Sequence, residues 1–171
     1  MKYQNIAVLT ALLLALSGSA WANSATVTVN VSCTILPLFE MEVTGPNGGN
    51  IEFGMIRKDP DQSIDASAPE VTIKATSNLG QPYMIKHELI APITSNEGAV
   101  LPDGSMTVNA SSASGGSAAN GKPVSTDSDV LYQSDATGQS DTVTAHYNLN
   151  VDPNQEAGQY QSKLLYTIIT V

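Results

Sequence analysis

The side chains that could carry out acid–base or metal chemistry are few and far apart in the sequence. The two histidines, His87 and His146, each stand at an outward position between apolar residues of an expected strand, without a neighbouring base or third ligand. Three aspartates, Asp59, Asp61 and Asp65, suggest calcium, but the glycine and distal glutamate of a helix-loop-helix calcium site are missing. We expect surface or cross-strand histidines, a solvated acidic loop, and no metal or other cofactor.

Motifs for nucleophilic catalysis and phosphate binding are also missing. The sequence has no Gly-x-Ser-x-Gly elbow, no glycine-rich phosphate loop and no Cys-x-x-Cys. Cys33 is the only cysteine, so an intramolecular disulfide is excluded. Its position in phase with the preceding valines favours a small buried hydrophobe over a reactive or intermolecular thiol. We therefore predict that the protein is not an enzyme.

The N-terminal segment has the organisation of a secretory signal peptide. Lys2 precedes an apolar run at residues 6–16, and small residues around Trp21 form an Ala-x-Ala cleavage site that ends at Ala22. The apolar run is shorter than the ~20 residues that span a bilayer, which argues against an anchoring helix. We expect residues 1–22 to be removed by cleavage after Ala22 and the rest of the chain to be exported.

The charge balance restricts the partners of the mature protein. The whole chain has 171 residues, with 7 Lys and Arg against 16 Asp and Glu. Removal of residues 1–22, which contain one lysine and no acidic residue, changes the formal net charge from −9 to −10. The remaining chain has the size of one domain. Its negative charge would repel phosphates, so we exclude nucleic acid and anionic membrane as partners.

The clearest structural signal begins just after the cleavage site. Between residues 25 and 35, apolar side chains alternate with small polar ones. Successive side chains of an extended strand point to opposite faces, so this pattern predicts one continuous apolar face. We call it the N-terminal ridge, and it consists of Val27, Val29, Val31, Cys33 and Ile35. Such a strand needs a sheet, supplied either by the same chain or by a neighbouring molecule.

The rest of the chain indicates an all-β protein. No segment after the signal peptide has helical periodicity, and turn residues separate the strands. We expect residues 70–76 and 83–90 to form a hairpin or meander. Residues 94–129, which contain the low-complexity run 111–121 and one expected strand, should be a mobile surface loop. About eight to nine strands in this arrangement predict an antiparallel β-sandwich of immunoglobulin-like or Greek-key type. Beyond the ridge, the expected strands are 38–43, 51–56, 70–76, 83–90, 106–110, 130–132, 142–151 and 159–171.

The last expected strand has no charged residue after Lys163 and is apolar on both faces. Isolated sandwiches protect their edges with charge, proline or short strands. The two terminal strands of this chain lack that protection. Their composition favours pairing between subunits by strand addition, in which backbone hydrogen bonds give affinity and alternate side chains give specificity.

The order of these segments resembles that of the subunits of bacterial chaperone–usher pili, most closely the disulfide-free colonisation-factor type. The resemblance rests on residues 26–31 leading to a proline-marked second strand, on residues 121–125 (Gly-Lys-Pro-Val-Ser), and on residues 157–161 (Ala-Gly-Gln-Tyr-Gln) before the final apolar strand. It implies an immunoglobulin-like sandwich that lacks its last strand. A periplasmic chaperone fills the gap, and at the outer-membrane usher the N-terminal extension of the next subunit replaces the chaperone.

On this resemblance, residues 23–36 are a donor-type strand and residues 37–171 a pilin-like domain. The N-terminal ridge is then inserted into a neighbouring subunit, and the resulting homopolymer is a fimbrium at the cell surface that contributes to adhesion. The acceptor groove is bordered by Leu164, Tyr166, Ile168, Ile169 and Val171.

Two other interpretations remain open. The protein is a secreted or surface coat or matrix protein whose N-terminal strand closes its own sheet, or it is a monomeric carbohydrate-binding adhesin. A host or surface glycan is a candidate partner for the adhesive roles. The mature chain has no tryptophan to stack on a sugar ring, since the only one is Trp21 in the signal peptide.

Overall fold

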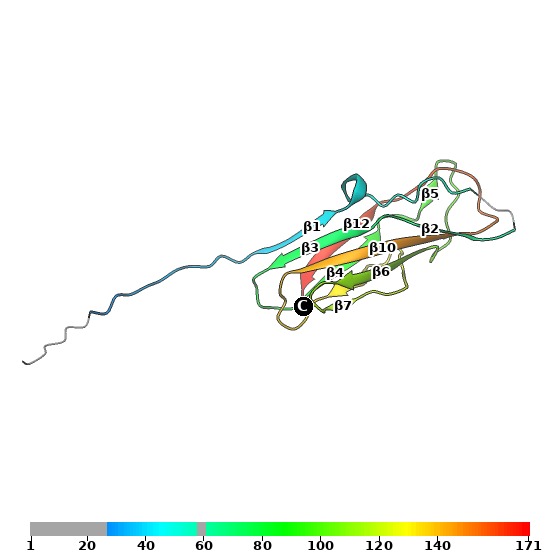
Figure 1. Ribbon diagram of the computed structural model, residues 1–171. Coiled ribbons are helices and arrows are strands. Elements are labelled where there is room, and N and C mark those ends of the chain that lie inside the picture. The colour runs from blue at the N-terminus through cyan, green and yellow to red at the C-terminus, as the bar shows by residue number, and fades with distance from the viewer. Residues whose placement is uncertain (1–26, 58–60) are drawn as a thin grey trace, which may run out of the picture. The chain divides into compact units, whose positions relative to one another are not determined.

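The computed structural model describes residues 27–57 and 61–171. The chain divides into two units, Met1–Ile35 and Leu36–Val171. All strands found in the described residues belong to the second unit, and the only helical turn there is the 3-10 helix η1 (Pro46–Gly49) (Figure 1). No helix in these residues is long and apolar enough to span a membrane. The predicted signal peptide and residues 23–26 lie outside the described residues.

The strands of Leu36–Val171 form two antiparallel sheets and a two-stranded ribbon. The first sheet has the order β1–β3–β10–β6–β8, with β2 paired to the end of β10 beyond β3. The second has the order β12–β4–β9–β7, and β5 pairs with β11. The bounds are β1 Phe39–Thr44, β2 Ile64–Ser67, β3 Val71–Ser77, β4 Tyr83–Leu89, β5 Thr94–Ser95, β6 Met106–Ser112, β7 Ser117–Ala118, β8 Lys122–Pro123, β9 Asp129–Gln133, β10 Asp141–Val151, β11 Tyr160–Gln161 and β12 Leu164–Thr170.

Alternating side chains from the two sheets form one core. Every second residue of β4 and of β10 is buried, as the period of two requires. Across the core, the ring of Phe39 on β1 meets the ring of Tyr83 on β4 edge-on, with centroids 5.9 Å apart. The hydroxyls of Tyr147 on β10 and Tyr166 on β12 lie 2.8 Å apart. This packing of one sheet against the other confirms the predicted all-β, antiparallel sandwich.

Three of the expected local structures are wrong. Residues 70–76 and 83–90 are not a hairpin, because β3 lies in the first sheet and β4 in the second. Residues 51–56 contain no strand, although Ile51, Phe53 and Ile56 pack partly buried against the core. The acidic loop expected around Asp61 and Asp65 contains β2, which extends the first sheet beside β10.

The low-complexity run 111–121 is also more ordered than its composition predicts. The backbone of Ala119 joins two strands, because Ala110 N–H donates to its carbonyl at 2.7 Å and its own N–H donates to Leu131 O at 2.8 Å. Ser114 N–H donates to the carboxylate of Asp141 at 3.0 Å. Backbone hydrogen bonds to neighbouring strands organise the segment, and they do not depend on apolar side chains.

Candidate strand-docking site

The described part of the N-terminal ridge is not in a strand. Residues 27–38 contain no strand, and the side chains of Val27, Val29, Val31 and Ile35 are between 74% and 94% exposed. Cys33 is a free, exposed thiol, so the expected burial of Cys33 is wrong for the single chain. A strand needs a hydrogen-bonding partner along its backbone, so the ridge would become a strand only by pairing with another one.

The second set of predicted site residues lies on β12, the outermost strand of the second sheet. Among the described residues β12 pairs only with β4, and its other edge has no strand beside it. Leu164, Tyr166, Ile168 and Ile169 are partly buried, whereas the alternate residues of β4 are fully buried. Val171 follows the end of the strand and is 61% exposed. The second sheet therefore ends in an apolar strand that its own chain covers incompletely.

At one edge of the first sheet lies β1, which the sequence did not assign to the site and whose apolar residues alternate with the exposed Glu40 and Glu42. Among the described residues β1 pairs only with β3, along one edge. Phe39, Met41 and Val43 pack against the core but remain partly exposed. The signal for this role is present in the sequence as three alternating apolar residues on a short strand directly after the ridge.

Residues 51–56 have the side-chain pattern of a strand but no backbone partner. Ile51, Phe53 and Ile56 lie partly buried against the core, and Met55 is fully exposed. We find no backbone–backbone hydrogen bond from residues 51–57 to the other described residues. Backbone groups next to a core are ordinarily paired, so this segment is a third place where an added strand would complete the hydrogen bonding.

A polar cluster joins the two sheets behind β12. Nδ1 of His87 on β4 lies 3.3 Å from the hydroxyl of Tyr147, which in turn lies 2.8 Å from the hydroxyl of Tyr166. Nε2 of His87 is buried without a hydrogen-bond partner in the described structure. Burial lowers the pKa of His87, raises that of Tyr147, and raises that of Tyr166 to about 12. All three groups are therefore neutral at pH 7.

The outward position expected for His87 is wrong, and the one expected for His146 is right. His87 is 1% exposed because it lies in phase with the buried residues Tyr83, Ile85 and Leu89 of β4. His146 lies on the exposed face of β10, with Nε2 3.0 Å from a carboxylate oxygen of Glu70. Among the described residues, neither histidine belongs to a group of three or more potential metal ligands.

A second buried polar cluster connects β9 to β10. The hydroxyl of Tyr132 donates to Asp141 Oδ2 at 2.5 Å, and the backbone N–H groups of Ser114 and Thr142 donate to Oδ1. Burial by itself would raise the pKa of Asp141, but these hydrogen bonds outweigh it and hold that pKa below its usual value. The carboxylate thus connects Tyr132 on β9 and Ser114 in the run 111–121 to the start of β10, which is a structural role.

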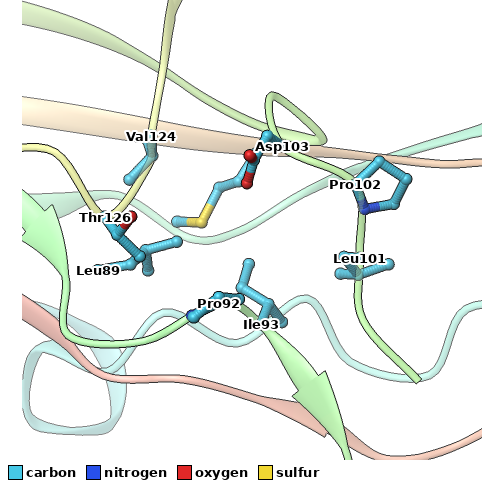
Figure 2. Close-up of a pocket in the computed structure, with 9 residues that line it drawn as sticks. Leu89, Pro92, Ile93, Leu101, Pro102, Asp103, Val124 and Thr126 are labelled. Atoms are coloured by element: carbon cyan, nitrogen blue, oxygen red, sulfur yellow. The ribbon is translucent and has the colours of Figure 1, made fainter. Parts of the chain in front are cut away.

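The described residues include no group of three potential metal ligands; Asp59 lies outside them, and Asp65 accepts a hydrogen bond from the side chain of Asn150 at 2.6 Å. Figure 2 shows an apolar cavity between Leu89, Ile93 and Leu101 that has a volume of about 10 Å³. That volume admits at most one water molecule.

One open depression lies next to the β5–β11 ribbon, between residues 90–95 and 161–163. Its lining is partly apolar, with Ile90, Ala91 and Pro92, and partly polar, with hydroxyl and amide side chains and Lys163. Two of the hydroxyls are committed to backbone carbonyls, because Thr94 donates to Pro92 O and Ser162 to Ala91 O.

No model of a known protein family matches the sequence, and no curated protein matches it either.

Proposed function

We propose that this protein is a structural subunit of a bacterial surface pilus or fimbria, assembled by strand donation and contributing to adhesion. One observation carries the proposal. The chain has an alternating apolar segment with exposed side chains, while among the described residues each sheet has at one edge a strand, β1 or β12, whose apolar side chains are incompletely covered. In the assembly, residues 25–35 of one copy pair with the open strand edges of the next.

The composition of the ridge suits insertion between strands. Residues 25–35 contain no charged side chain, so the insertion desolvates no ion. Burying each of the exposed residues Val27, Val29, Val31 and Ile35 would contribute about 1.5–3 kcal/mol. Main-chain hydrogen bonds to β12 add affinity that does not depend on the side chains.

The exposed apolar segments also explain why a subunit of this kind needs a chaperone and an usher. Exposed apolar strand edges pair indiscriminately with other chains, so an unprotected subunit aggregates. A periplasmic chaperone that covers β12, and an outer-membrane usher that replaces the chaperone with the next ridge, would prevent this. The route requires export through the periplasm to the cell surface, with the signal peptide cleaved after Ala22. The sandwich is then of immunoglobulin-like type, with its last strand supplied by a neighbour.

The coat-protein interpretation is less well supported. It requires the N-terminal segment to form a strand that closes the sheet of its own chain, whereas residues 27–35 contain no strand. A monomeric adhesin would need a sugar-binding site, for which the mature chain offers no tryptophan.

A charge scan of the ridge tests the proposal. Val31→Asp places a carboxylate on the buried face of the donated strand, where an unpaired charge costs several kcal/mol, so assembly should fail. Asn30→Asp adds the same charge on the opposite face and should assemble normally. Assembly is measured by size-exclusion chromatography of the mature protein, and binding by adding a synthetic peptide of residues 25–35. Normal assembly of the Val31→Asp protein would refute strand donation.

The thiol of Cys33 provides an independent measurement. It is exposed in the single chain, so a maleimide should label it rapidly in monomers. In assemblies the ridge is buried and labelling should be slow. A polymer with a fully reactive Cys33, or a stable monomer with a protected one, contradicts the proposal; the second result would instead support a self-closed sheet.

A further inference from the structure

The side chain of Asn78 holds the backbone at the point where the ridge leaves the sandwich. Asn78 lies in the connection between β3 and β4. Its Oδ1 accepts a hydrogen bond from Leu38 N–H at 2.6 Å, and its Nδ2 donates to Leu36 O at 2.9 Å. Its backbone N–H also donates to Leu38 O at 3.1 Å. One residue thus makes three hydrogen bonds to residues 36–38.

These bonds continue the pairing of β1 with β3 beyond the end of both strands. Phe39 is opposite Ser77, so Leu38 is opposite Asn78 in the same antiparallel register. The amide side chain then takes the place of a further backbone partner for Leu36. Pro37 has a fixed φ angle and restricts the residue before it to extended conformations. Residues 36–38 are therefore held as an extension of β1, and the structure has no turn or bend there.

In an alternative conformation, residues 36–38 would form a hairpin loop, and the ridge would pair with β1 of its own chain. β1 is paired along one edge only among the described residues. Hairpin loops commonly have about two to five residues, so residues 36–38 are long enough to turn the chain back. Residues 27–35 would then lie antiparallel to β1 on its open edge. Such a hairpin must rotate the backbone of Leu36 and Leu38 and would break their bonds to Asn78.

We propose that Asn78 keeps the ridge available for a second copy of this chain by opposing that hairpin. Asn78 is a positioning residue, because it acts on residues 36–38 and not on the docked strand. The inference rests on the proposed function, in which residues 25–35 are donated to another subunit. On this inference, the exposed side-chain amide of Asn78 favours assembly over pairing of the ridge with β1 of its own chain.

Graded variants of the mature protein test this role. Asn78→Leu removes both side-chain hydrogen bonds and keeps the backbone one, whereas Asn78→Asp keeps the acceptor for Leu38 N–H and loses the donor to Leu36. Asn154→Leu is the control, because Asn154 is an exposed turn residue far along the chain. Each protein is refolded from denaturant, separated by size-exclusion chromatography, and labelled at Cys33 with a maleimide.

We expect Asn78→Leu to raise the ratio of monomer to polymer about tenfold, the effect of losing two exposed hydrogen bonds. Cys33 in that monomer should be protected, since the ridge lies on its own β1. Asn78→Asp should fall between wild type and Asn78→Leu, and Asn154→Leu should match wild type. If wild type polymerises and binds the peptide of residues 25–35 but Asn78→Leu partitions like wild type, the role of Asn78 is refuted and the proposed function stands. If wild type neither polymerises nor binds the peptide, both are refuted.

Discussion

Acidification should destabilise the sandwich through His87, the buried histidine of β4. Within its sheet, His87 lies between Tyr166 on β12 and Asp129 on β9. Tyr147 on β10 contacts it from the other sheet. Burial lowers the pKa of His87 below its usual 6.5, and the charge of Asp129 opposes this shift only in part. A proton added to Nε2 would find no acceptor there among the described residues.

The sign and size of the effect follow from proton linkage. In the unfolded chain His87 binds a proton as the pH falls through about 6.5, but in the folded protein it stays neutral to a lower pH. The stabilising contribution is therefore complete above pH 6.5. Below that pH the free energy of unfolding falls by about 1.4 kcal/mol per pH unit until the folded pKa is reached. This is a substantial part of a total stability of about 5–15 kcal/mol.

The assay is urea unfolding of the mature protein at several pH values between 8 and 5. His87→Leu should remove the extra slope below pH 6.5, while the hydroxyls of Tyr147 and Tyr166 still bond each other. His146→Gln is the matched control, because His146 is the other histidine and is exposed. It should leave the slope in place. Equal slopes for wild type and His87→Leu below pH 6.5 would show that the burial of His87 does not govern acid stability.

Two further changes test the packing. Tyr132→Phe leaves the buried carboxylate of Asp141 without one hydrogen bond and should lower the free energy of unfolding by about 1.5–3 kcal/mol in urea titrations; a loss below about 0.5 kcal/mol would contradict the structural role of the pair. Gly138→Ala should cost much more than Gly80→Ala in thermal melts. Both glycines have positive φ angles, 57° and 65°, but an added Cβ at 138 overlaps the backbone carbonyl of Gln81 and one at 80 meets nothing. Equal losses would refute that contact.

Much of the strand content could be predicted from the sequence because a strand imposes its period locally. The alternation of Val143, Ala145, Tyr147 and Leu149 with polar residues predicted β10 and its buried face. The same rule would have placed His87 inside, since it is in phase with Tyr83, Ile85 and Leu89. That error came from treating histidine as an outward residue.

Other features depended on partners distant in the sequence. Residues 111–121 have too few apolar side chains to predict order, yet Ala119 bridges β6 and β9 through its backbone and Asp141 holds Ser114. Ile51 and Phe53 alternate like a strand but have no strand beside them among the described residues. Composition and periodicity do not predict which backbone groups form hydrogen bonds with each other.

The sequence by itself determined the all-β class and the apolar alternation of the ridge, because both follow from side-chain order along an extended chain. Only the tertiary structure decided that β3 and β4 belong to different sheets and that β1 and β12 each lie at one edge of a sheet. It also placed Asn78 opposite Leu38. These outcomes depend on which distant strands compete for the same backbone hydrogen bonds, and that competition is settled only when the whole chain packs.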